Sequence, residues 1–132
     1  MDEKKMQKYI VSPRLIEELV HHDISRMEKG VGPLFKFMDQ QMVKESDVTV
    51  LVRKVEKEPP RDLIIGPSLH KHEVNQLYCL LGDIELEVTL RDEKHRAKAP
   101  TSILVPAGIN HAIRFLKGKG YLVNVLSGAK YR

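Results

Sequence analysis

The sequence has little of what marks a secreted, membrane-bound or nucleic-acid-binding protein. Cys79 is the only cysteine in 132 residues, so no intrachain disulfide can form, and this favours a reducing compartment. No apolar run approaches the roughly 18 residues of a membrane-spanning helix, and the charged N-terminus lacks the apolar core of a signal peptide. We therefore expect a cytoplasmic protein without a membrane span.

Long basic runs and clustered aromatic residues are also missing. The 22 Lys and Arg residues outnumber the 18 Asp and Glu residues, which gives a net charge of +4, but they are scattered along the chain. The aromatic residues are only three Phe and four Tyr. Because nucleic-acid binders usually gather basic and aromatic side chains on one surface, the sequence does not indicate a nucleic-acid partner.

The remaining composition, 42% apolar and 30% charged, is typical of a globular protein of one domain. We expect that domain to consist of an N-terminal arm and helix over residues 1–46, packed on a barrel over residues 47–132. Ser12 followed by Pro13 predicts the start of the helix. Apolar residues then recur on one side up to Gly30, which predicts the end of the helix.

From residue 47 onward the pattern predicts short strands separated by Pro or Gly turns. Residues 47–55 are apolar on both faces, and residues 84–90 alternate as a half-buried strand does. RDEKHR at 91–96 predicts a charged hairpin loop that includes His95. Further predicted strands span residues 76–81, 101–105, 111–115 and 121–126. Many short strands of this kind favour an all-β sandwich or barrel.

Two segments of this strand region carry histidines at a spacing that suits a metal ion. His70 and His72 are two residues apart, which directs both side chains to one face of an extended strand. Two such imidazoles can share a metal ion if another segment supplies the remaining ligands. His111, which follows a proline-glycine turn, is the expected third ligand, and Gln76 is the candidate fourth.

The segments 66–82, GPSLHKHEVNQLYCLLG, and 106–115, PAGINHAIRF, resemble the two motifs of the cupin superfamily. The resemblance covers residues 47–127 and implies a jelly-roll β-barrel that holds one metal ion. The chain is thus expected to be all-β apart from its N-terminal helix. The matching residues are the paired histidines His70 and His72, the closing Gly82, and Pro106, Gly108 and His111 of the second motif.

The chain departs from the family pattern at the remaining ligand, which is usually a glutamate. Gln76 stands nearest to that place, but its spacing to Gly82 is one residue short, so Asn75 is the alternative. Phe115 stands where the second motif often has an asparagine. Three neutral imidazoles and an amide would leave the charge of a divalent ion uncompensated, which favours an anionic organic ligand. Gln76 could instead hydrogen-bond a metal-bound water.

Strand alternation gives the other side chains expected around the metal. If the histidines and Gln76 point inward, then Tyr78, Leu80, Ile113 and Phe115 do so too and form a mostly apolar pocket. The sequence assigns no catalytic residue, and Tyr78, with its hydroxyl, is the one candidate. No nucleophile with an adjacent base, carboxylate pair or phosphate-binding loop is evident, so any chemistry has to come from the metal.

The resemblance implies one divalent metal ion, with Fe, Zn, Ni, Mn and Co all compatible, and a small organic anion as its partner. The protein could be a metal-dependent dioxygenase or isomerase, a non-catalytic binding or sensor protein, or a degenerate metal-free barrel. The fold does not decide among them. Because residues 47–55 are apolar on both faces and residues 1–46 extend beyond the barrel, we also expect a homodimer.

Overall fold

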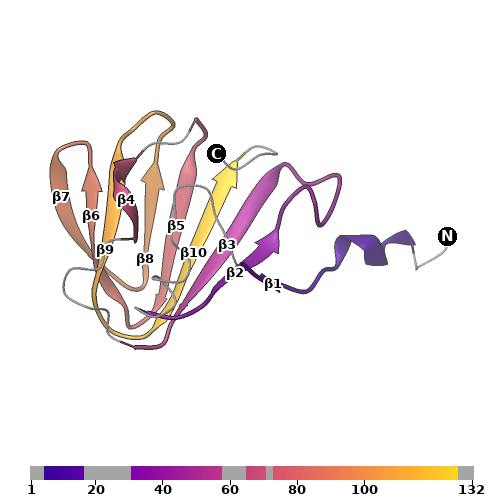
Figure 1. Ribbon diagram of the computed structural model, residues 1–132, viewed down its shortest axis with the longest axis horizontal. Helices are drawn as coiled ribbons and strands as arrows, with labels where there is room; N and C mark the ends of the chain where they lie inside the picture. The colour runs from indigo at the N-terminus through magenta and orange to yellow at the C-terminus, as the bar shows by residue number, and fades with distance from the viewer. Residues whose placement is uncertain (1–4, 17–30, 58–64, 71–72, 128–132) are drawn as a thin grey trace.

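The computed structural model describes residues 5–16, 31–57, 65–70 and 73–127, with the backbone alone for 65–70. Within these ranges the regular secondary structure is almost wholly antiparallel strands, arranged in two sheets (Figure 1). The larger sheet has the order β1-β2-β3-β10-β5-β8, and the smaller sheet has the order β4-β9-β6-β7. The all-β expectation for the barrel is therefore confirmed.

The strands of the larger sheet are β1 (Arg14–Leu15), β2 (Leu34–Met38), β3 (Val48–Val55), β5 (Gln76–Gly82), β8 (Thr101–Val105) and β10 (Gly120–Ser127). Those of the smaller sheet are β4 (Ile65–His70), β6 (Glu85–Leu90), β7 (Glu93–Lys98) and β9 (His111–Lys117). Most of these strands were predicted from short apolar or alternating runs separated by Pro or Gly turns. The division of the domain at residue 46 stays a prediction.

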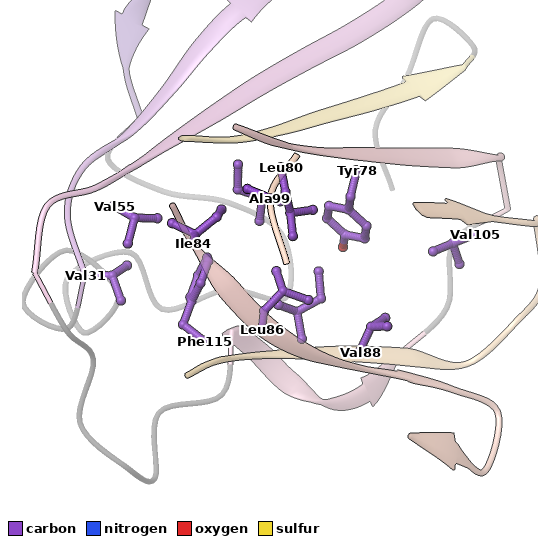
Figure 2. Packing of buried hydrophobic residues seen from close by; sticks show 12 residues of the cluster. Val31, Val55, Tyr78, Leu80, Ile84, Leu86, Val88, Ala99, Val105 and Phe115 are labelled. Carbon is purple, nitrogen blue, oxygen red and sulfur yellow. The ribbon is translucent and has the colours of Figure 1, made fainter. Parts of the chain in front are cut away.

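A hydrophobic core fills the space between the two sheets (Figure 2). Leu80 reaches into it from β5 of the larger sheet, and Leu86 and Phe115 reach into it from the smaller sheet. Each of these side chains is almost completely buried, and burying one such side chain contributes about 1.5–3 kcal/mol. Alternation explains the arrangement, because residues two apart on a strand share a face.

The predicted helix start at Ser12 is wrong. Arg14 and Leu15 form β1 and pair with β2, and the next amide, that of Ile16, donates to the carbonyl of Leu34 at 2.9 Å. Leu15 is exposed while Ile16 is buried, which is the alternation of a strand. Proline before a short edge strand is also tolerated, so Pro13 fits this structure equally well. The rest of the predicted helix, residues 17–30, lies outside the described residues.

The helical element described in the N-terminal arm is the short 3-10 helix Gln7–Tyr9. It belongs to an arm that projects away from the sheets beyond β1 (Figure 1). Lys8 of this arm forms an exposed ion pair with Glu45 at 3.2 Å, a contact that contributes little to stability. In the described part of the chain, no helix has the length and apolar character needed to cross a membrane.

The predicted hairpin loop at 91–96 is also wrong, because Glu93–Lys98 form strand β7. β7 pairs with β6 along its whole length, from Glu85 opposite Lys98 to Leu90 opposite Glu93. The turn is only Arg91-Asp92, with Arg91 in the left-handed region at φ 59°. Charged side chains on both faces indicated a loop, but they are equally typical of an edge strand, where they discourage pairing with other chains.

Candidate metal centre

His111 begins β9 in the smaller sheet and is only 1% exposed. Its backbone lies directly opposite that of His70 in β4. The Nδ1 atom is 3.1 Å from the carbonyl oxygen of Ile109. Because a carbonyl oxygen can only accept, Nδ1 carries a proton, and in the neutral form of the ring the lone pair is on the buried Nε2. This tautomer is the one that a metal-binding histidine adopts when its other nitrogen contacts the backbone.

The structure describes the first cupin-like motif only in part. Strand β4 brings the backbone of His70 beside His111, as the two-motif prediction requires. The side chain of His70 is not among the described features, and His72 lies outside the described residues. The assignment of both histidines as ligands therefore stays a prediction.

Gln76 begins β5 in the larger sheet and is 2% exposed. Its Nε2 donates to the Tyr78 hydroxyl at 2.9 Å and to Asn124 Oδ1 at 2.8 Å. Its Oε1 is buried and accepts no hydrogen bond from the described residues. Leaving a buried carbonyl oxygen unsatisfied costs about 1–3 kcal/mol, so a bound cation or hydrogen-bond donor at this place would be stabilised.

Tyr78 contacts both Gln76 and His111. Its hydroxyl points into the space between the sheets (Figure 2) and accepts from Gln76, while its ring meets that of His111 edge-on with centroids 6.3 Å apart. A buried amide and a buried imidazole, from opposite sheets, thus both contact one tyrosine.

The alternative ligand Asn75 has a different local role. Its side chain is exposed, and its Oδ1 accepts from the backbone N–H of Ala107 at 2.9 Å. Asn75 thereby ties the start of β5 to the proline-glycine turn that precedes His111. Its amide oxygen is already satisfied, whereas that of Gln76 is not.

The predicted pocket residues all lie inside the molecule. Leu80, Ile113 and Phe115 belong, with Tyr78, to the main hydrophobic core. Ile113 and Phe115 lie two and four residues after His111 on β9, so the three side chains share one face of the strand. The two lie opposite Val88 and Leu86 of β6. That these side chains line a ligand pocket stays a prediction.

The donor atoms suit a divalent first-row metal, which binds imidazole nitrogen well and accepts amide oxygen. Across the described ranges, no three His, Cys, Asp or Glu side chains gather into a cluster, so the fit rests on other features. These are the unsatisfied oxygen of Gln76, the tautomer of His111 and the backbone position of His70. Together they fit a metal site at this end of the core.

Sequence reasoning missed Asn124, which contacts Gln76 from β10. Its backbone lies opposite Tyr78, and Leu122 and Leu126, two residues away on either side, are both buried in the cores. A polar residue between two inward-facing leucines was a signal in the sequence. Such a residue inside a sheet usually has a specific hydrogen-bond partner.

No family model matches the sequence, and no curated protein is similar to it. Solved structures do match. KdgF from Halomonas sp. is 17% identical, with 74% of this chain and 81% of that chain covered and a TM-score of 0.57. An RmlC-like cupin from Shewanella frigidimarina is 16% identical, with 74% and 78% covered and a TM-score of 0.53.

A third similar structure is oxalate decarboxylase from Bacillus subtilis, a protein with Mn(II) centres. It is 12% identical with a TM-score of 0.60, and the match covers 92% of this chain but 30% of that longer chain. At these identities the likeness establishes the architecture and not the activity. The chain therefore has the cupin fold that its two sequence motifs predicted.

Proposed function

We propose that this protein is a metal-binding cupin whose divalent ion chelates a small organic anion. The ligands are His70, His72 and His111, and Gln76 supplies an amide oxygen as the fourth. The single observation that carries the proposal is the buried Oε1 of Gln76, which the described residues leave without a hydrogen bond. The burial of the His111 imidazole, whose Nδ1 contacts the Ile109 carbonyl, supports it.

The charge of the site supports an anionic ligand. The buried polar side chains among the described residues are Thr49, Arg53, Gln76 and His111, and none of these is a carboxylate. A divalent ion held by imidazoles and an amide therefore keeps its full charge within the ligand shell. In a partly buried site this charge attracts a carboxylate or enolate strongly, because little water screens it.

When bound, the ion would act as a Lewis acid or, if redox-active, would activate dioxygen. The chain's own residues would bind the ion and orient the anion. Tyr78 places its hydroxyl beside Gln76 and its ring beside His111, so it would contact an anion on the metal. The absence of a buried carboxylate from the described core also favours the second candidate, a binding or sensor protein without turnover.

We expect small carboxylates and keto acids to bind only to the metal-loaded protein. Metal content is measured by elemental analysis of the purified chain, and ligand affinity by calorimetry before and after chelator treatment. Restoring the metal should restore binding. Equal affinity for the metal-free protein would contradict the proposal, and the same panel assayed for oxygen consumption and product formation separates an enzyme from a sensor.

We also propose a homodimer in which a second copy covers the outer face of the larger sheet. Val50, Val125, Leu77 and Leu104 form one apolar row across four strands of this face. Leu104 is 60% exposed. The projecting arm adds Ile10, which is 78% exposed. Such large exposed apolar surface is typical of an interface.

The dimer predicts a sedimenting mass of about twice the 15.1 kDa of one chain at micromolar concentration. Leu104→Glu should shift the species toward monomer, because it places a charge in the apolar row. Lys94→Glu, on the exposed edge strand β7, is the matched control and should leave the mass unchanged. A monomeric wild type would rule the dimer out.

A further inference from the structure

The side-chain amide of Gln76 is held by both of its N–H groups. One donates to the Tyr78 hydroxyl and the other to Oδ1 of Asn124. A primary amide can rotate by about 180°, which exchanges the positions of its nitrogen and its oxygen. In the observed orientation both acceptors hold Nε2, so they oppose this exchange.

The orientation of this amide determines whether Gln76 helps or opposes a cation. With Nε2 bound to Asn124, the Oε1 atom is left buried and available. In the reverse orientation the amide would present N–H groups, whose partial positive charge repels a metal ion. Asn124 can hold the Gln76 amide in the first orientation, because its own strand, β10, is fixed by pairing with β3 on one side and β5 on the other.

We infer that Asn124 is a positioning residue that holds the oxygen of Gln76 toward the metal centre. This inference rests on the function proposed above. Asn124 does not itself bind the metal; it acts through Gln76, together with the Tyr78 hydroxyl. Losing such an outer hydrogen bond typically weakens metal affinity by about 10- to 100-fold.

The test is a titration of the metal-free protein with Co²⁺, followed by visible absorption. Asn124→Leu, similar in shape but without an acceptor, should weaken Co²⁺ binding by about 10- to 100-fold. Asn124→Asp keeps an acceptor for Nε2 and should bind Co²⁺ at least as tightly as the wild type. Thr49→Val removes a different buried polar group, a hydroxyl, from the same sheet and should leave the affinity unchanged.

A double-mutant cycle shows whether Asn124 acts through Gln76. In a Gln76→Ala background, Asn124→Leu should cause no further loss of Co²⁺ affinity. An equal loss in both backgrounds would overturn the inference. Asn124→Ala takes the place of the leucine variant in the cycle if the latter does not fold.

A metal-free measurement separates this inference from the proposed function. In the wild type, both side-chain amide protons of Gln76 should exchange slowly with solvent by NMR, because both are hydrogen-bonded in a buried site. In Asn124→Leu one of them should exchange faster. If the wild type fails to bind Co²⁺, the proposed function fails and the exchange rates still decide on Asn124. If Co²⁺ binds but the exchange rates do not differ, only the inference is overturned.

Discussion

Purified His111→Ala protein should contain no stoichiometric metal, whereas the wild type should hold one ion per chain. Of the proposed ligands, His111 has the ring whose position is fixed most clearly, by the carbonyl of Ile109 and by burial in the core. Structural zinc sites with four ligands bind with roughly 10–16 kcal/mol, or about 3 kcal/mol for each ligand. Losing one imidazole should therefore weaken metal binding by roughly two orders of magnitude. At that affinity the metal should be lost during purification.

The matched control for this experiment is His95→Ala. His95 is exposed on strand β7, and its ring Nε2 lies 3.2 Å from the carboxylate of the neighbouring Glu93. Its removal should leave the metal content unchanged. Because alanine also leaves a cavity in place of His111, the thermal unfolding of both variants is compared without metal. Full metal content in a folded His111→Ala protein would show that the assignment of His111 is wrong.

Gln76→Glu should strengthen metal binding and weaken the binding of an anion to that metal. Opposite charges about 4 Å apart interact by roughly 4 kcal/mol at the effective dielectric constant of a protein surface, before the cost of desolvation. The neighbouring groups can adapt, since a tyrosine hydroxyl and an asparagine amide can both donate to a carboxylate. Metal affinity is measured by competition with a chelator, and anion affinity by calorimetry at saturating metal.

The two affinities should move in opposite directions, which a general loss of stability would not produce. Asn75→Asp is the control, because it adds the same charge one residue away on an exposed side chain that can keep its bond to Ala107. Solvent should screen that charge, so both affinities should change little. If Gln76→Glu alters neither affinity, then Asn75, or no fourth protein ligand, becomes the better assignment.

The sequence predicted most of the barrel strands because burial of one or both faces produces short alternating or apolar runs, which Pro and Gly turns separate. The prediction from sequence failed for segments whose residue pattern does not reflect burial. β7 carries charge on both faces, and near Ser12 a helix-start signal was overridden by the pairing of Leu15 with Phe35. The motif spacing also predicted that β4 and β9 meet, as they do at His70 and His111.

The support around Gln76 could not be predicted in the same way. Asn124 contacts it over 48 residues of sequence, and this contact depends on the strand order of the larger sheet rather than on any local pattern. Alternation placed Gln76 on an inner face, but it could not tell which of its two amide atoms has partners.

The place of β10 in the larger sheet has a consequence for synthesis. β10 follows all the other strands in sequence, yet it lies between β3 and β5, which do not pair with each other. As the chain leaves the ribosome, β1-β2-β3 and β5-β8 can form only as separate groups of strands, each with an open edge. Those edges close when Gly120–Ser127 emerges, and the same event brings Asn124 to Gln76. The proposed metal site should therefore be completed late in synthesis, after the larger sheet has formed.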